Sequence, residues 1–487
     1  MSEITQNPPL TCYYIAAAAK FVGWSERALH LVFLLPTIAL VLGAYRLAQK
    51  FTRSPGLAAV ATLLTPALLV SACSTMCDPM MLALWIWATI FWIEGLDSGK
   101  PLLLTASALL ITASELTKYF GAGLILLLFA YSCLRQRRLG PWAWYLLIPV
   151  SVLIGYEFLT ARIYGHGLLT TAAQFSGTRR LSTHSSKGAK VLIGLSYVGG
   201  CALPGLLFAP IIWARKQIVM VALASGVAVF LIMHGRVRLS MGATGTAARM
   251  GRHAHWEIIS FHLILFIAGG VSVLALAIAD YWRERNPDSL FLLLWVAGTF
   301  WFTAFLNWTI NARSVLPMVP AVGILLARRL ENLPGNSGRR LKFSVASALL
   351  VSGVLSLWLA RADTELANTA KTAALLIREK TYGSGDLWFV GHSGFQYYLQ
   401  ALGARAYDWN HPQAKNGDWI AILQVWPSYG ALKFQGPRED FIMPVRSHAS
   451  TNSPERSAGF YYSYWSVLPY IFDRVPPERD VLVRLAQ

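Results

Sequence analysis

Long apolar runs recur along the chain from about residue 27 to residue 361, and short polar or basic stretches separate them. Runs of roughly 18 or more apolar residues are typical of membrane helices, because that length crosses the hydrocarbon as a helix. The pattern therefore predicts an all-α polytopic membrane bundle. Its about twelve spans are expected near 27–49, 55–73, 79–96, 101–115, 119–134, 141–161, 191–213, 217–234, 257–280, 289–306, 313–328 and 341–361.

The pattern changes after residue 361. "GDLWFVGHSGFQYYLQALG" predicts a short strand, a turn and a helix, and "DWIAILQVW" and "RDVLVRL" predict further strands. We expect two domains, a transmembrane domain over 1–361 and a small α/β domain outside the membrane over 362–487.

Composition agrees with a membrane protein and excludes several other classes. Of the 487 residues, 55% are hydrophobic and only 14% are charged, whereas about a quarter are charged in soluble proteins. A net charge of +18 can indicate nucleic-acid binding. Here the basic residues interrupt spans and form no single stripe, so no nucleic-acid partner is expected. The five cysteines are scattered and form neither a zinc pattern nor a disulfide framework.

Short basic loops alternate with less basic ones, which predicts the topology. By the positive-inside rule the basic loops face the cytoplasm. The other loops are 74–78, 115–119, 162–190, 235–256 and 307–312; these, the N-terminus and everything after 361 are expected outside a plasma (inner) membrane. Loops 162–190 and 235–256 also carry basic residues, which either touch anionic headgroups or form an anion site. The cytoplasmic set is Arg46, Lys50, Arg53, Lys100, Arg135, Arg137, Arg138, Arg215, Lys216, Arg283, Arg285, Arg328, Arg329, Arg339, Arg340 and Lys342.

Asp78 stands between two apolar runs, in "SACSTMCDPMM". Charges within or beside spans are costly and are functional candidates. Asp followed by Pro also suits the start of a helix, so one reading is a helix cap. The other is a catalytic or metal-binding carboxylate at the outer mouth of the bundle.

Two further polar groups map to the same predicted outer level. In "ASELTKYFGAG", Glu115 and Lys118 are three residues apart, which allows a structural ion pair, but Lys118 followed by Tyr119 also suits a lipid-linked phosphate. In "NWTINARSVLPMVP", Asn311 and Arg313 precede a predicted span. Arg313 either extends to the interface or contributes to the same site.

A carboxylate and several cations at one outer mouth fit group transfer from an anionic, lipid-linked donor. A carboxylate can act as base toward an acceptor hydroxyl, and cations can stabilise a departing phosphate. A divalent metal held by the carboxylate is a further option that the sequence leaves open.

These motifs, in this order, resemble the GT-C superfamily of polyprenyl-phosphate-sugar-dependent glycosyltransferases, with protein O-mannosyltransferases and lipid A aminoarabinose transferases the nearest branch. The matching stretches, within about residues 7–330, are "NPPLTCYYIAAAAKFVGW", "CDPMMLALW", "LTKYFGAGLILL" and "NARSVLPMVPAVGILLA". The resemblance implies a helical bundle with a cavity on the outer face and inverting transfer from a polyprenyl phosphate. It implies that Lys118 and Arg313 contact the donor phosphate, with Tyr119 and Asn311 beside them. Asp78 would line the same cavity and support the acceptor, a metal or the loop structure; it is the catalytic candidate that remains in this chain, because the family's expected base is the first acidic residue.

The chain departs from the family pattern near its start. Asn7 stands where the family usually has His, and the expected first helix and acidic pair are missing, so a truncated or inactive enzyme is one expectation. Two alternatives remain. A secondary transporter or flippase would show inverted repeats and broken helices near the bilayer midplane, which the sequence does not indicate. A non-catalytic membrane subunit would use residues 362–487 to bind a partner. The sugar and the acceptor are not encoded in any recognisable motif.

Overall fold

A computed structural model of the chain describes residues 7–182, 186–233, 255–333, 338–423, 434–462 and 466–486. Its contacts divide the chain into two compact units. The first, here called the membrane unit, comprises Met1–Gly242, Trp256–Ala360 and Gly459–Pro469. The second, the C-terminal unit, comprises Ala243–His255, Arg361–Ala458 and Tyr470–Gln487.

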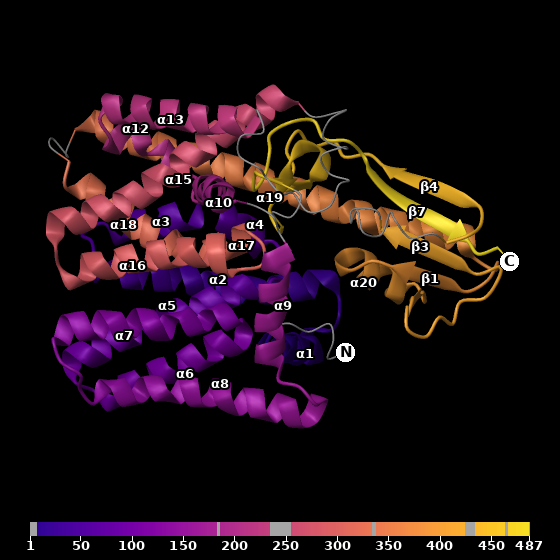
Figure 1. Cartoon of the computed structure of the whole chain (residues 1–487), viewed down its shortest axis with the longest axis horizontal. Helices are drawn as coiled ribbons and strands as arrows, with labels where there is room; N and C mark the ends of the chain where they lie inside the picture. Colours follow the sequence, from indigo (N-terminus) through magenta and orange to yellow (C-terminus); the bar gives the residue numbers. More distant parts are fainter. Residues whose placement is uncertain are drawn as a thin grey trace. The chain divides into compact units, whose positions relative to one another are not determined.

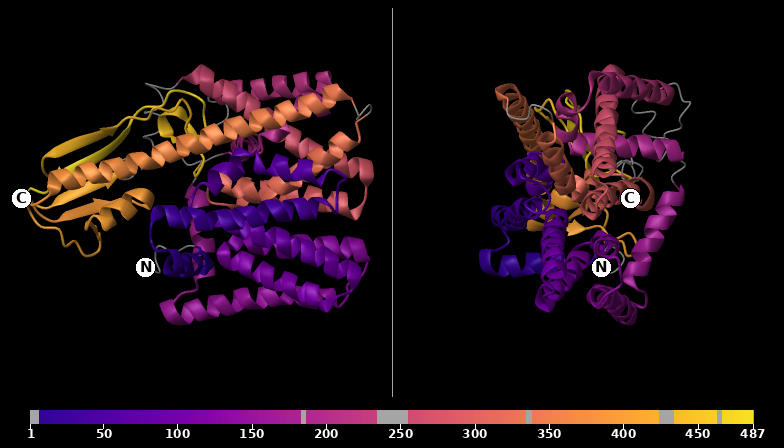
Figure 2. Two further views of the ribbon diagram at one scale, coloured as in Figure 1. Left: turned by 180° about the vertical axis from the view of Figure 1, so that it is seen from behind. Right: turned by 90° about the vertical axis from the view of Figure 1, so that its left-hand side faces the viewer.

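The membrane unit is built from helices, most of which run roughly alongside one another (Figures 1 and 2). In chain order these are α1 (Leu10–Val22), α2 (Glu26–Ala48), α3 (Pro55–Leu63), α4 (Pro66–Ala72), α5 (Cys77–Ser98), α6 (Pro101–Thr117), η1 (Tyr119–Ala122), α7 (Gly123–Gln136), α8 (Trp142–Tyr164), α9 (Leu168–Ser182), α10 (Lys187–Cys201), α11 (Pro204–Leu207), α12 (Ala209–Ile212), α13 (Arg215–Met233), α15 (Trp256–Glu284), α16 (Pro287–Trp301), η2 (Phe302–Leu306), α17 (Ala312–Val315), η3 (Leu316–Met318), α18 (Val319–Glu331) and the first half of α19 (Arg339–Thr381).

Within the described residues, eight helices are long and apolar enough to cross a membrane, or up to nine if the bent pair α3–α4 is one span. The helical membrane bundle is therefore confirmed, but the count of about twelve spans is not. Three predicted spans fall short. α6 has 17 residues, the run 191–213 is divided among α10, α11 and α12, and the run 313–328 is divided among α17, η3 and α18. Prolines inside the last two runs explain the breaks, because a proline removes a backbone donor and clashes with the preceding turn.

Helices α10 and α15 pack backbone against backbone. A Cβ on Gly199 of α10 would overlap the carbonyl of Phe266, and one on Gly270 of α15 would overlap the carbonyl of Leu195. Only glycine permits this approach. The contact fixes the rotation of α10 and hence the direction of its buried Tyr197.

The C-terminal unit is a five-stranded sheet with helices on one face. The strands are β1 (Leu387–Val390), β2 (Arg405–Ala406), β3 (Trp419–Leu423), β4 (Arg438–Met443) and β7 (Glu478–Arg484), in the order β2-β1-β3-β7-β4. β1 is parallel to β2 and β3, while β7 is antiparallel to β3 and β4. Two short strands, β5 (Asn452–Ser453) and β6 (Ala458–Gly459), pair separately around η4 (Pro454–Arg456).

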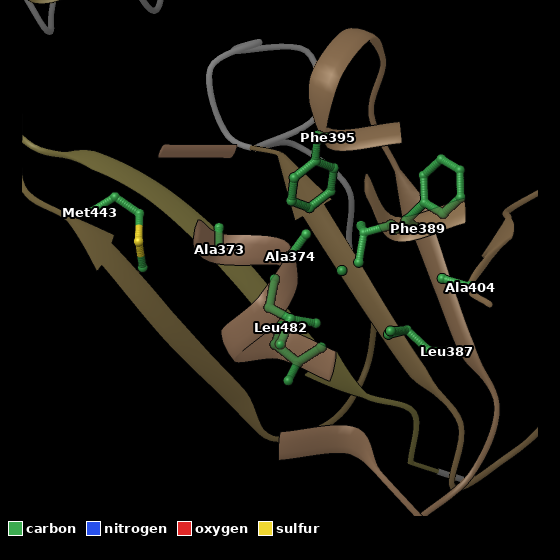
Figure 3. Packing of buried hydrophobic residues seen from close by; sticks show 11 residues of the cluster. Ala373, Ala374, Leu387, Phe389, Phe395, Ala404, Met443 and Leu482 are labelled. Atoms are coloured by element: carbon green, nitrogen blue, oxygen red, sulfur yellow. The ribbon is translucent and has the colours of Figure 1, made fainter. Parts of the chain in front are cut away.

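Alternating strand residues divide the core of this unit into two layers. Leu387 and Phe389 face α20 (Ser393–Ala401) and the second half of α19, as Figure 3 shows. Trp388 and Val390 lie in a second apolar cluster with residues of β3 and β7. The predicted strand, turn and helix after residue 386 are confirmed, as are the strands in "DWIAILQVW" and "RDVLVRL". α19 itself continues past the predicted end of its span, to Thr381.

Candidate functional site

Asp78 lies in the first turn of α5 and is completely buried. The N-cap position belongs to Met76, and no side chain caps this helix end. The interpretation of Asp78 as a helix cap is therefore wrong. A carboxylate in the first turn still interacts favourably with the partial positive charge at a helix N-terminus, but its main partners come from elsewhere in the chain.

Lys118 and Arg313 both pair with this one carboxylate. Lys118 Nζ is 2.5 Å from Asp78 Oδ1, and Arg313 Nε is 2.8 Å from Asp78 Oδ2. The two cationic side chains are each 19% exposed, whereas the carboxylate is 0% exposed. Arg313 therefore does not extend to the interface away from the site. We call Asp78, Lys118 and Arg313 the charged triad.

The end of α6 fixes Lys118. Lys118 has extended backbone where α6 stops, and its carbonyl accepts a hydrogen bond from Gly121 N–H at 2.8 Å. A Cβ on Gly121 would lie 2.5 Å from the backbone nitrogen of Glu115, so the chain turns back tightly onto α6. Ser114 Oγ donates to the Met81 carbonyl at 3.1 Å. This bond ties α6 to α5 one turn from each charged residue.

The short helix α17 carries Arg313, and Asn311 caps it. Asn311 Oδ1 accepts from Ser314 N–H at 2.8 Å and from Ser314 Oγ at 2.9 Å. Asn307 Nδ2 also donates to Ser314 Oγ, at 2.6 Å. Asn311 thus has a structural role next to Arg313, and its predicted role in substrate binding stays a prediction.

Tyr119 and Glu115 lie near the triad in sequence but make no described contact with it. The Tyr119 ring lies 6.5 Å from the ring of Tyr156 in α8, so its role toward a phosphate also stays a prediction. The Glu115–Lys118 ion pair is not formed, because Lys118 pairs with Asp78. Glu115 is completely buried, and neither carboxylate oxygen has a hydrogen-bond partner among the residues that the structure describes.

The triad carries two positive charges and one negative charge, which leaves an excess of one positive charge in a poorly solvated place. Arg313 uses Nε for Asp78, and its guanidinium carries further N–H donors that suit phosphate oxygens. Both Asp78 oxygens are engaged by cations. In the described part of the chain, no three His, Cys, Asp or Glu side chains come together as a group that could hold a metal ion. The arrangement is thus suited to binding an anion.

A segment far along the chain lies against this site, and sequence reasoning missed it. Residues Gly459–Pro469, here called the return segment, belong to the membrane unit although the chain on both sides belongs to the C-terminal unit. The Phe460 carbonyl accepts from Ala312 N–H at 2.9 Å, next to Arg313. Tyr197 OH donates to the Gly459 carbonyl at 2.7 Å. No local pattern could reveal this contact, because Tyr197 and Gly459 are 262 residues apart.

The basic residues of the predicted outer loops are only partly described. Arg236, Arg238, Arg249 and Arg252 of loop 235–256 lie outside the described residues, and the side chains of Arg179 and Arg180 in α9 are also outside them. Their predicted contribution to an anion site remains a prediction.

Comparison with known proteins gives one family match and several similar folds. Residues 6–156 match the family described as dolichyl-phosphate-mannose-protein mannosyltransferase. No curated protein is matched by the sequence. ArnT from Cupriavidus metallidurans bound to undecaprenyl phosphate is similar at 15% identity and a TM-score of 0.43, over 88% of this chain and 86% of that one. An oligosaccharyltransferase from Archaeoglobus fulgidus tethered with an acceptor peptide is similar at 14% identity and a TM-score of 0.44, over 82% of this chain and 55% of that one.

The matched residues 6–156 include Asp78 and Lys118, two members of the charged triad, while Arg313 lies beyond them. Over these residues the match agrees with the resemblance to polyprenyl-phosphate-sugar-dependent glycosyltransferases that the sequence motifs indicate.

Proposed function

We propose that this chain is a membrane glycosyltransferase that takes its sugar from a polyprenyl-phosphate donor. Transfer inverts the anomeric centre and delivers the sugar to an acceptor on the outer face of the inner membrane. The proposal rests on one observation: Lys118 and Arg313, from distant parts of the chain, both pair with the buried carboxylate of Asp78. The family match over residues 6–156 supports the reaction class.

Lys118 and Arg313 are the groups that hold the donor phosphate. When the bond between the anomeric carbon and the phosphate oxygen breaks, negative charge develops on that oxygen. Fixed cations in a poorly solvated site stabilise this charge without having to reorganise. Each cationic side chain is partly exposed and can therefore reach a ligand while it remains paired with Asp78.

Asp78 holds the two cations in place and keeps the empty site from carrying two uncompensated charges. Without it, Lys118 and Arg313 would repel each other where solvent screening is weak. Action as a base toward the acceptor hydroxyl would require Asp78 to release one cation first, because both of its oxygens are occupied. Release could accompany phosphate binding, since the phosphate offers the cation a new partner.

The test uses the full chain in lipid nanodiscs with undecaprenyl phosphate as the probe. Lys118→Met and Arg313→Met should each weaken binding by about ten- to a hundredfold, the usual scale for a charge-assisted hydrogen bond. Lys50→Met is the matched control, because Lys50 pairs with Glu94 in a solvent-accessible position. Unchanged affinity in both site variants would contradict the proposal.

Binding alone does not establish transfer. The same preparation should therefore be given radiolabelled polyprenyl-phosphate sugars, and release of the sugar to water or to an acceptor should be measured. Release that depends on Lys118 and Arg313 supports an enzyme. Binding with no release for any donor would favour the alternative of a non-catalytic subunit or a lipid carrier.

A further inference from the structure

From the contacts of the return segment we infer that it positions Arg313 and so sets the affinity of the site for phosphate. The inference rests on the proposed function, because it assigns Arg313 to the donor phosphate. Of this segment the structure describes residues 459–462 and 466–469. Phe460, Ser466 and Leu468 are completely buried, so the segment is an internal part of the membrane unit.

The first contact acts on the helix that carries Arg313. The four residues of α17 lead directly into η3 and α18, so Arg313 lies in the first turn of this helical run, where the backbone N–H groups need partners from outside the helix. Asn311 caps its N-terminus, and the Phe460 carbonyl accepts the hydrogen bond from Ala312 N–H. Thr303 Oγ1 donates to the Ser314 carbonyl at 2.9 Å, and Asn307 Nδ2 donates to Ser314 Oγ. The return segment thus holds the residue that directly precedes Arg313, while the other groups bind Ser314 on its far side.

The second contact closes the return segment on itself and anchors it to α10. The hydroxyl of Tyr197 donates to the Gly459 carbonyl at 2.7 Å and lies 2.8 Å from Ser466 Oγ. Ser466 Oγ also donates to the Tyr462 carbonyl at 3.1 Å. The Gly459 N–H also donates to the Leu468 carbonyl at 3.0 Å, so a backbone bond closes the segment and the buried Tyr197 hydroxyl anchors it to α10. The segment is tightly packed at Gly459, because a Cβ on this residue would overlap Ser466 Oγ and the Tyr462 carbonyl.

The third contact places an aromatic ring of the return segment beside the loop that leads into α17. The Tyr462 ring lies 6.2 Å from the ring of Trp308, in the loop that leads into α17. The return segment therefore contacts both the loop before α17 and the first residue of α17.

These contacts make Tyr197 a positioning residue for a site that it does not touch. Loss of its hydroxyl would detach the return segment from α10, let the Phe460 carbonyl shift away from Ala312, and let Arg313 leave the orientation that pairs with Asp78. Phosphate would then meet one fixed cation, Lys118, and one mobile cation. A mobile cation binds more weakly, because binding must also restrict its motion.

The experiment is a double-mutant cycle in the full chain, with Tyr197→Phe and Arg313→Met separately and together. Undecaprenyl phosphate affinity should fall about tenfold in Tyr197→Phe, as expected for the loss of a buried hydrogen bond. In the Arg313→Met background the same change should have no further effect. A merely structural role would weaken binding in both backgrounds. Ser466→Ala, which removes only one contact, should give a smaller loss and replaces Tyr197→Phe if that variant does not accumulate.

The control is Ser196→Ala. Ser196 is the neighbour of Tyr197 in α10 and is equally buried, and its hydroxyl has no hydrogen-bond partner among the described residues. Its removal should leave affinity unchanged. A tenfold loss in this control would overturn the inference, because any disturbance of α10 would then suffice.

Thermal unfolding of the same four proteins of the cycle, measured without ligand, separates this inference from the proposed function. If wild-type protein binds no polyprenyl phosphate but the two substitutions are non-additive in unfolding, the proposed function fails while the positioning of Arg313 is supported. If the effects add in both affinity and unfolding, the return segment does not act through Arg313 and the inference is overturned.

Discussion

Asp78→Asn is the most direct test of how the charged triad is held together. The substitution keeps the size of the side chain and removes its charge. Lys118 and Arg313 then remain as two neighbouring cations with no described carboxylate between them. An asparagine oxygen can still accept one hydrogen bond, but its amide group is a donor that faces a cation.

The structure sets the expected magnitude. Removing one partner of a buried ion pair costs about 3–5 kcal/mol of stability, because the other charge stays buried without compensation. Here the two cations are each 19% exposed, so solvent offsets part of the loss and about 3 kcal/mol is expected. The control is Asp97→Asn. The Asp97–Arg135 pair has 40% and 34% exposed side chains, for which about 1 kcal/mol or less is expected.

The assay is unfolding of the full chain in mild detergent, followed by tryptophan fluorescence at pH 7. Asp78→Asn, Lys118→Met and the double variant complete a cycle. The double variant should be more stable than the sum of the single losses predicts, by at least about 1 kcal/mol, because it no longer holds two adjacent cations. The reasoning is refuted if Asp78→Asn costs no more than Asp97→Asn, or if the two substitutions are additive. Asp78 would then not be the common partner of two charges.

Three further predictions concern other parts of the chain. Gly121→Ala should destabilise the protein by about 1–3 kcal/mol and weaken phosphate binding, since the new Cβ would meet the backbone of α6 and displace Lys118; unchanged unfolding would contradict the tight turn. Burial and the charge of Asp480 raise the pKa of Glu478 to about 7 from its ordinary 4.5. The folded C-terminal unit therefore favours the protonated form, and the stability from this group is lost as pH rises through about 7. Glu478→Gln should reduce this pH-dependent loss of stability by up to about 2 kcal/mol. Hydrogen exchange of β7 in the full chain measures the effect, and the same pH dependence in wild type and variant would refute the prediction. A reporter joined after Arg138 should lie in the cytoplasm and one joined after Gly383 outside, and finding both on one side would contradict the predicted topology.

Sequence reasoning succeeded where the signal is local. Apolar runs predicted the long helices, and the change of pattern after residue 361 predicted β1 and α20. The count of about twelve spans is not confirmed. At 191–213 and 313–328 the predicted span is divided, because hydropathy sums over a window and does not register that a proline ends a helix inside it. The end of α19 failed for a related reason. Its polar second half no longer looks like a membrane span, but the backbone continues as one helix to Thr381.

In the candidate site, too, features with a local sequence signal could be predicted and features that depend on packing could not. Asp78, Lys118 and Arg313 could be selected from sequence, because a charge beside an apolar run is unusual, and their common level could be predicted from topology. What could not be predicted is that one carboxylate accepts from both cations, since this depends on packing among α5, α6 and α17. Nothing in the sequence indicated that the return segment packs against α10 and α17. Its anchors are a backbone carbonyl and two hydroxyls, and such groups occur throughout any sequence.

The order of the triad along the chain has a consequence for biosynthesis. Asp78 and Lys118 are 40 residues apart, on adjoining helices, whereas Arg313 follows Asp78 by 235 residues. A charged side chain entering a bilayer on a lone helix meets a penalty of about 2.5–3.5 kcal/mol. The hairpin α5–α6 can enter with the charges of Asp78 and Lys118 already paired, so these two residues together add no net charge. Arg313 arrives only when α17 is made, and it meets a carboxylate that is already in place. The nascent protein thus receives its excess positive charge last, when most of the bundle that shields it from lipid has been synthesised.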